Sequence, residues 1–223
     1  MTQYYSEHHI LVKKTARYYI SGEINDKTKV VLFALHGFGQ LARNFISEFD
    51  DLAKSGVVVI APEGLSRSNF GRASDSRIGA SWMSKEDRLN EIDDYVEYLD
   101  TLYNEITKGY SVDLKQEIKI YLLGFSQGGS TALRWFVNGN STFNELYICS
   151  SDIAKDVDPD KFRSKSQNSN IYYVYGKNDA SYSRKNFSDS ADFLKENKIR
   201  FSEKIFDGVH EINKDMIKKL INE

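Results

Sequence analysis

The chain has 223 residues, with 30 Lys and Arg against 32 Asp and Glu, a formal net charge of −2, and 40% hydrophobic residues. This length suits a single α/β domain spanning residues 1–223, and the balanced charge gives no electrostatic argument for nucleic acid or an anionic membrane as partner. The one cysteine, Cys149, excludes an intramolecular disulfide, and no histidine or acid stands near it at metal-ligand spacing.

The N-terminus lacks the basic start and apolar h-region of a signal peptide, and no apolar run reaches membrane-spanning length. We therefore expect a cytoplasmic protein without membrane insertion. The sequence indicates neither a metal nor a cofactor, and it does not indicate an oligomeric state.

In the first half of the chain, residues 10–13 and 17–20 predict two short strands that form an entry hairpin. Continuous apolar runs at 30–35 and 57–60 predict buried parallel strands, and Phe45, Phe49 and Leu52 between them have helical spacing. Residues 63–79 are mostly polar and predict a long loop with no large lid. A strong amphipathic pattern predicts a helix over 87–106.

In the second half, strands are predicted at 118–123, 146–149, 171–175 and 201–206, and helices at 127–137, 184–197 and 211–221. This alternation predicts an α/β fold: a mostly parallel, twisted sheet of about eight strands with helices on both faces.

Gly124-Phe125-Ser126-Gln127-Gly128 fits the pattern G-x-S-x-G and stands between a predicted strand and a predicted helix. This setting is typical of the nucleophile elbow of α/β-hydrolases, where a tight turn lifts a serine hydroxyl above the sheet. Ser126 is therefore the candidate nucleophile. The alternative is a glycine-rich turn in which Ser126 only caps the helix.

A serine nucleophile needs a base, and the order along the chain in this fold is Ser, acid, His. His210 is the one histidine that follows Ser126, so it is the candidate base. His8 and His9 are expected at the surface. His36 follows a predicted strand and is expected to brace the next loop, with a catalytic role as the alternative.

The acid should lie at the carboxyl end of a strand between Ser126 and His210. Asp179 is preferred because its strand directly precedes the one that leads to His210, and Asp152 is the alternative. The oxyanion of an acyl-transfer intermediate needs two backbone N–H donors. Gln127, directly after the serine, and Phe38, in the loop that follows residues 30–35, are the candidates.

Four segments resemble the carboxylesterase/phospholipase branch of the α/β-hydrolases, which includes acyl-protein thioesterases. They are Leu35-His36-Gly37-Phe38-Gly39, Gly124-Phe125-Ser126-Gln127-Gly128-Gly129, Gly176-Lys177-Asn178-Asp179 and Gly208-Val209-His210. Gly79-Ala80-Ser81-Trp82-Met83 resembles a bacterial subgroup of predicted esterases, whose corresponding Ser-Trp lies near the acyl pocket. The resemblance implies hydrolysis of a small-molecule carboxylic ester or thioester without cofactor or metal.

The resemblance also implies the same triad, Ser126, Asp179 and His210, and the same oxyanion donors, Phe38 and Gln127. Residues 66–78 depart from the thioesterase members because they are polar and contain Arg67, Arg72 and Arg77. We therefore expect short or soluble acyl esters rather than membrane lipids as substrates.

Arg72 and its neighbours either recognise an anionic group or form a solvated loop, and Phe70 and Trp82 either line the substrate pocket or belong to the core. Two alternatives to the esterase remain open at this level. One is a non-catalytic ligand-binding or interaction module, and the other is a thioesterase, lactonase or peptidase that uses the same triad.

Overall fold

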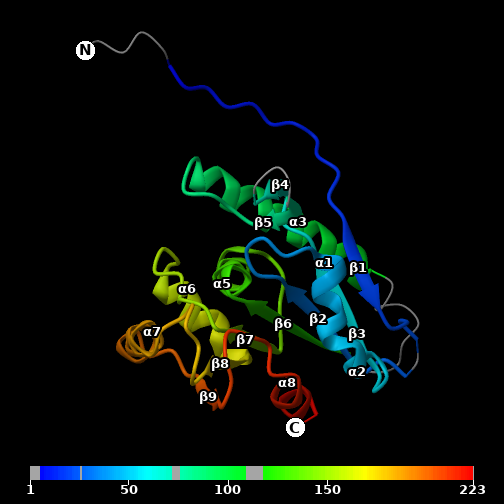
Figure 1. The fold of residues 1–223 in the computed structure, drawn as a ribbon, viewed down its shortest axis with the longest axis vertical. Coiled ribbons are helices and arrows are strands. Elements are labelled where there is room, and N and C mark those ends of the chain that lie inside the picture. Colours follow the sequence, from blue (N-terminus) through cyan, green and yellow to red (C-terminus); the bar gives the residue numbers. More distant parts are fainter. Residues whose placement is uncertain (1–5, 26, 72–75, 109–117, 223) are drawn as a thin grey trace.

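Seven strands form the central sheet in the order β1-β3-β2-β6-β7-β8-β9 (Figure 1). β1 pairs antiparallel with β3, and the other neighbours pair parallel. The computed structural model describes residues 6–25, 27–71, 76–108 and 118–222. The strands are β1 (Tyr18–Ser21), β2 (Val30–Leu35), β3 (Val57–Pro62), β6 (Lys119–Phe125), β7 (Glu145–Cys149), β8 (Asn170–Gly176) and β9 (Ser202–Phe206).

Helices cover both faces of this sheet, so its central strands are buried on both sides. In β2, Val31, Phe33 and Leu35 enter one core cluster, while the alternate residues of the strand enter the other. The first cluster packs against α3 (Arg88–Thr107), α5 (Gln127–Asn138), α6 (Pro159–Lys165) and α7 (Arg184–Glu196). The second packs against α1 (Ala42–Phe45), η1 (Ile46–Phe49), α2 (Asp50–Ala53) and α8 (Lys214–Ile221). None of the described helices has the length and apolar character needed to cross a membrane.

The expected α/β fold is confirmed, but two local predictions are wrong. Residues 10–13 form no strand: Ile10, Leu11 and Val12 are 87%, 91% and 78% exposed, and the sheet begins with β1. The entry hairpin is therefore absent from the described residues, since Lys14-Thr15-Ala16 contains no turn-forming glycine or asparagine. The sheet accordingly has seven strands rather than about eight.

The second difference concerns the loop predicted over residues 63–79, because the described parts of this range contain two strands. β4 (Ser66–Phe70) and β5 (Arg77–Ser81) pair antiparallel as a separate two-stranded sheet. Along the chain, β5 leads towards α3. Its backbone is hydrogen-bonded to the loop after β2: Gly39 N donates to Ala80 O (2.8 Å), and Ala80 N donates to Gln40 O (3.1 Å). This hairpin is thereby attached to the loop that Phe38 belongs to.

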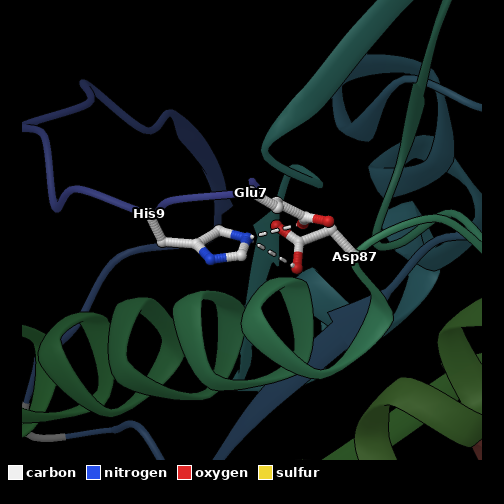
Figure 2. Close-up of side chains that lie close together, drawn as sticks. All are labelled: Glu7, His9 and Asp87. Atoms are coloured by element: carbon white, nitrogen blue, oxygen red, sulfur yellow. Dashed lines mark ion pairs between the residues drawn. The ribbon is translucent and has the colours of Figure 1, made fainter. Parts of the chain in front are cut away.

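The N-terminal arm, residues 6–16, extends away from the sheet (Figure 1). His9 Nε2 lies 3.2 Å from Glu7 Oε1 and 3.3 Å from Asp87 Oδ1 (Figure 2). Because Asp87 directly precedes α3, its ion pair with His9 attaches the arm to the rest of the domain. Within the described residues these three side chains are the group with ligand atoms close enough to share a metal ion. All three are exposed, and surface ion pairs account for their contact.

Candidate active site

The turn at Ser126 links the end of β6 directly to the start of α5. Ser126 has φ 54° and ψ −123°, a conformation that costs a residue with a side chain about 1–3 kcal/mol. A Cβ atom added to Gly124 would collide with the carbonyl oxygen of Gly128, and one added to Gly128 would collide with that of Leu35. Both positions therefore require glycine, which explains the spacing of the motif, and the turn has the geometry of a nucleophile elbow.

The loop that follows β2 lies against this turn. Gly37 approaches so closely that a Cβ atom there would lie 3.2 Å from Ser126 Cβ. The amides of Gly37, Gly39 and Gln40 each donate to an acceptor in the described structure. The Phe38 amide has no acceptor among the described residues, so it is free to donate to a ligand.

The side chain of Gln127 connects the elbow to the end of β5. Its Oε1 accepts the Trp82 N–H (3.2 Å), and its Nε2 donates to Ser81 Oγ (3.1 Å) and to the Met83 carbonyl oxygen (3.0 Å). The backbone N–H of Gln127 is the first of α5, where helix N–H groups have no partner within the helix. Sequence reasoning identified this N–H but missed the side-chain contacts, which depend on the tertiary position of β5.

Asp179 and His210 are in direct contact. His210 Nδ1 lies 2.7 Å from Asp179 Oδ2, and the carboxylate side chain is fully buried. Its other oxygen, Oδ1, accepts the backbone N–H groups of Ser181 (2.9 Å) and Tyr182 (2.7 Å). Three donors thus hold the carboxylate, one of them the Nδ1–H of His210.

Two loops are hydrogen-bonded together to bring this pair into contact. After β8, the amide of Lys177 donates to the carbonyl of Phe206 (2.9 Å), and the amide of Asn178 donates to that of Gly208 (2.9 Å). The loop that carries Asp179 is therefore fixed to the segment that leads from β9 to His210. Asp152, the alternative acid, forms no hydrogen bond or ion pair with His210 in the described structure.

Ser126, Gln127 and His210 line one hollow of about 220 Å³. Asp152 also lines it, and the rest of the described wall is polar or hydroxyl-bearing: Ser130, Ser150, Ser151, Ser181, Tyr182 and Asn186. Asp179 lies behind His210 and does not line the hollow. The structure thus brings serine and histidine to one small polar hollow, with the aspartate as the histidine's buried partner.

Trp82 and Phe70, the two aromatic pocket candidates, do not line this hollow. Trp82 is 1% exposed, and its Nε1 donates to the His36 carbonyl oxygen (2.8 Å), so it belongs to the core. The Phe70 ring contacts the Phe38 ring edge-to-face at 5.1 Å between centroids, which places it against the loop after β2. Arg72, the third candidate, lies outside the described residues.

His36 braces the loop beneath the site. Its Nδ1 lies 2.8 Å from the Gly37 carbonyl oxygen, and its Nε2 accepts the Gly64 N–H (3.0 Å), which defines a neutral ring protonated on Nδ1. Burial lowers the pKa of this fully buried imidazole. His36 therefore has the bracing role expected from the sequence and does not line the hollow at Ser126.

We expect the lowered pKa of His36 to make the fold less stable in mild acid. The unfolded chain binds a proton below the ordinary histidine pKa of about 6.5, whereas the folded ring stays neutral, so stability is lost as pH falls below that value. The loss is at most about 1.4 kcal/mol per pH unit for one group. Urea unfolding at pH 7.5 and 5.5 measures it: the decrease should be smaller in His36→Gln than in the wild type, and equal decreases would contradict the assignment.

The arginine-rich segment is partly explained by a buried carboxylate. Glu63 has a fully buried side chain and accepts hydrogen bonds from Arg17 Nε (2.7 Å), from Arg67 Nη1 (3.1 Å) and from the Ala42 amide (3.2 Å). Burial raises the pKa of Glu63, but the hydrogen bonds outweigh this effect and lower it overall. Arg67 therefore serves the fold, as the counter-ion of Glu63.

Comparison with known proteins agrees with this geometry. A sequence model described as phospholipase/carboxylesterase matches residues 17–223. The fold is similar to that of esterase PE8 (TM-score 0.70, 18% identity, covering 94% of this chain and 99% of that one). It is also similar to Zea mays acyl-protein thioesterase 2 (0.68, 17%, 93% and 97%) and to a carboxylesterase from Mesorhizobium loti (0.68, 15%, 93% and 94%). No curated protein sequence matches the chain significantly.

The solved structures are too distant in sequence to carry more than the fold, but the family match spans almost the whole chain, including the elbow, Asp179 and His210. The chain therefore belongs to the phospholipase/carboxylesterase family of α/β-hydrolases and is a serine hydrolase that acts on carboxylic esters.

Proposed function

We propose that the chain hydrolyses short or soluble acyl esters through an acyl-enzyme formed on Ser126, with His210 as base and Asp179 as its orienting partner. The observation that carries this proposal is the His210–Asp179 contact of 2.7 Å beside a hollow that His210 shares with Ser126. The small size and polar wall of that hollow support a soluble substrate over a long lipid chain.

In the first half of the reaction, Ser126 Oγ attacks the ester carbonyl carbon while His210 Nε2 takes the hydroxyl proton. The N–H groups of Phe38 and Gln127 stabilise the negative charge that develops on the carbonyl oxygen. The C–O bond to the alcohol then breaks, and the proton on His210 passes to the departing alcohol. The product is the ester between Ser126 and the acyl group.

In the second half, a water molecule attacks this acyl-enzyme while His210 takes its proton. The C–O bond to Ser126 breaks, the proton returns to the serine oxygen, and the free acid leaves. Asp179 remains ionised throughout and stabilises the positively charged imidazolium that forms in each half.

Two measurements test the proposal directly. Wild-type protein should hydrolyse p-nitrophenyl acetate or butyrate, and a fluorophosphonate probe should label Ser126 alone, as located by peptide mass spectrometry. A folded protein that the probe leaves unlabelled would refute it. A matched pair of oxygen and sulfur esters of the same acid then compares ester with thioester hydrolysis.

We expect Gln127→Ala to lower kcat/KM by about tenfold, because the hydrogen bonds from its side chain to residues 81–83 are lost while its backbone N–H remains. Ser81→Ala, which removes one of those partners, should have a smaller effect. Because both changes act on the same contact, the double variant should lose less than the product of the two single effects. Strictly independent effects would show that this contact does not position the elbow.

A further inference from the structure

The charge of the hollow at Ser126 gives information about the substrate. Among the described residues that line it, Asp152 is the one acidic side chain, and none is lysine or arginine. The Asp179 carboxylate is buried behind His210. Any group of the ester that extends from the carbonyl into this hollow therefore meets a negative field.

The Asp152 carboxylate is not engaged by the fold. Asp152 is exposed, and within the described part of the chain no donor or cation bonds to its carboxylate oxygens. Asp179, by contrast, accepts three hydrogen bonds. The backbone nevertheless holds Asp152 close to the elbow. Ser126 N donates to Cys149 O (2.9 Å) at the end of β7, and Asp152 follows β7 by three residues.

A second hollow, of about 360 Å³, shares part of its wall with the first. Asp152 and Asn186 line both hollows, and Asp189 and Lys155 lie in the wall of the second. Asp189 is paired with Lys185. The described wall that the two hollows share thus contains the free Asp152 carboxylate and no cation.

One hydroxyl group in the wall of the hollow, that of Ser150, also lacks a partner among the described residues. Ser150 is 2% exposed, and its hydroxyl has no hydrogen-bond partner in the described structure. A buried hydroxyl without a partner costs free energy, so an occupant of the hollow that bonds to it would recover that cost. This is a second indication that a polar group belongs in the space beside Ser126.

The described basic side chains near the site point elsewhere. Arg67 pairs with the buried Glu63. Arg43 and Arg77 line a different hollow, with Gly39 and Glu48. The described wall of the hollow at Ser126 therefore contains no lysine or arginine that would draw in an anionic ester.

We propose that Asp152 determines specificity, favouring esters that carry a cationic ammonium or amine group a few bonds from the scissile carbonyl. This inference rests on the proposed hydrolysis at Ser126. The cation sits in the hollow beside Asp152 while the carbonyl oxygen faces the N–H groups of Phe38 and Gln127. In this proposal the Asp152 carboxylate acts on the substrate instead of on His210.

The test uses acetylcholine and 3,3-dimethylbutyl acetate, which have the same shape but differ in that a quaternary nitrogen replaces a carbon. At low ionic strength the wild type should show a kcat/KM about fivefold higher for the cation, the scale of a partly exposed charge pair. The ratio should fall to about one in Asp152→Asn and below one in Asp152→Lys, and salt should reduce the wild-type ratio.

The control is Asp51→Asn, which removes one carboxylate from α2, where it pairs with Lys54 (3.1 Å), and should keep the wild-type ratio. A wild-type ratio of one, or a ratio that survives in Asp152→Lys, would overturn the assignment of Asp152. Failure of the hydrolysis itself would be recognised separately, because p-nitrophenyl acetate turnover and fluorophosphonate labelling would then be absent from the wild type as well.

Discussion

Ser126→Ala is expected to lower kcat for p-nitrophenyl acetate by about 10⁴- to 10⁶-fold, because it removes the hydroxyl proposed to form the acyl-enzyme. The residual rate should stay above that of water, since the N–H groups of Phe38 and Gln127 remain in place to stabilise the oxyanion. Initial rates over a range of substrate concentrations measure the effect, and KM should change far less than kcat.

A matched control for this variant is Ser130→Ala, a neighbouring hydroxyl on α5 that donates to the Gln127 carbonyl oxygen (3.1 Å). Its effect should be orders of magnitude smaller than that of Ser126→Ala. Circular dichroism should show that both variants are folded. Turnover close to wild type in a folded Ser126→Ala protein would refute the assignment of the nucleophile.

Asp179→Asn is expected to reduce kcat by about 10³- to 10⁴-fold, although the new side chain has the same shape. Ser181 and Tyr182 donate to one oxygen of Asp179, so the amide oxygen of an asparagine would stay with those two N–H groups. Its NH₂ group would then point at His210 Nδ1. The imidazole would have to carry its proton on Nε2, where it could not accept the proton of Ser126.

Asp207→Asn is the control, because Asp207 lies close to His210 in sequence but accepts a hydrogen bond from Asn178 Nδ2 (2.9 Å) instead. It should turn over p-nitrophenyl acetate at close to the wild-type rate. Proton NMR offers a second readout, since the downfield Nδ1 proton of His210 should be lost in Asp179→Asn and kept in Asp207→Asn. Equal losses of activity in the two variants would contradict the role of Asp179.

Much of the site could be predicted because it depends on local chain geometry. Ser126 has a glycine two residues before it and another two residues after it, at a junction of strand and helix. This local pattern predicts the tight turn that the structure has at Ser126. The order of residues then selected His210. Chain order does not decide between Asp179 and Asp152, because both follow the carboxyl ends of neighbouring strands. The contact of Asp179 with His210 depends instead on the backbone hydrogen bonds between the loops after β8 and β9.

The elements missed from sequence have weak hydrophobic patterns. β4 is exposed along most of its length, so no alternation marks it as a strand. α6 is short and has Phe162 as its buried side chain, although Asp158-Pro159 is a recognisable helix start: Asp158 accepts the N–H groups of Asp160 and Lys161. The side-chain role of Gln127 likewise depends on β5, whose position no local pattern indicates.

The strained backbone at Ser126 connects the proposed catalysis to the folding stability of the domain. The residue proposed to do the chemistry is held at φ 54°, in a conformation that costs about 1–3 kcal/mol, against a total stability for a domain of about 5–15 kcal/mol. The strain that positions the Ser126 hydroxyl therefore lowers the folding stability by a noticeable fraction of its total. A glycine at this position would relieve the backbone strain, so if Ser126 is the nucleophile, Ser126→Gly should give a more stable but inactive protein.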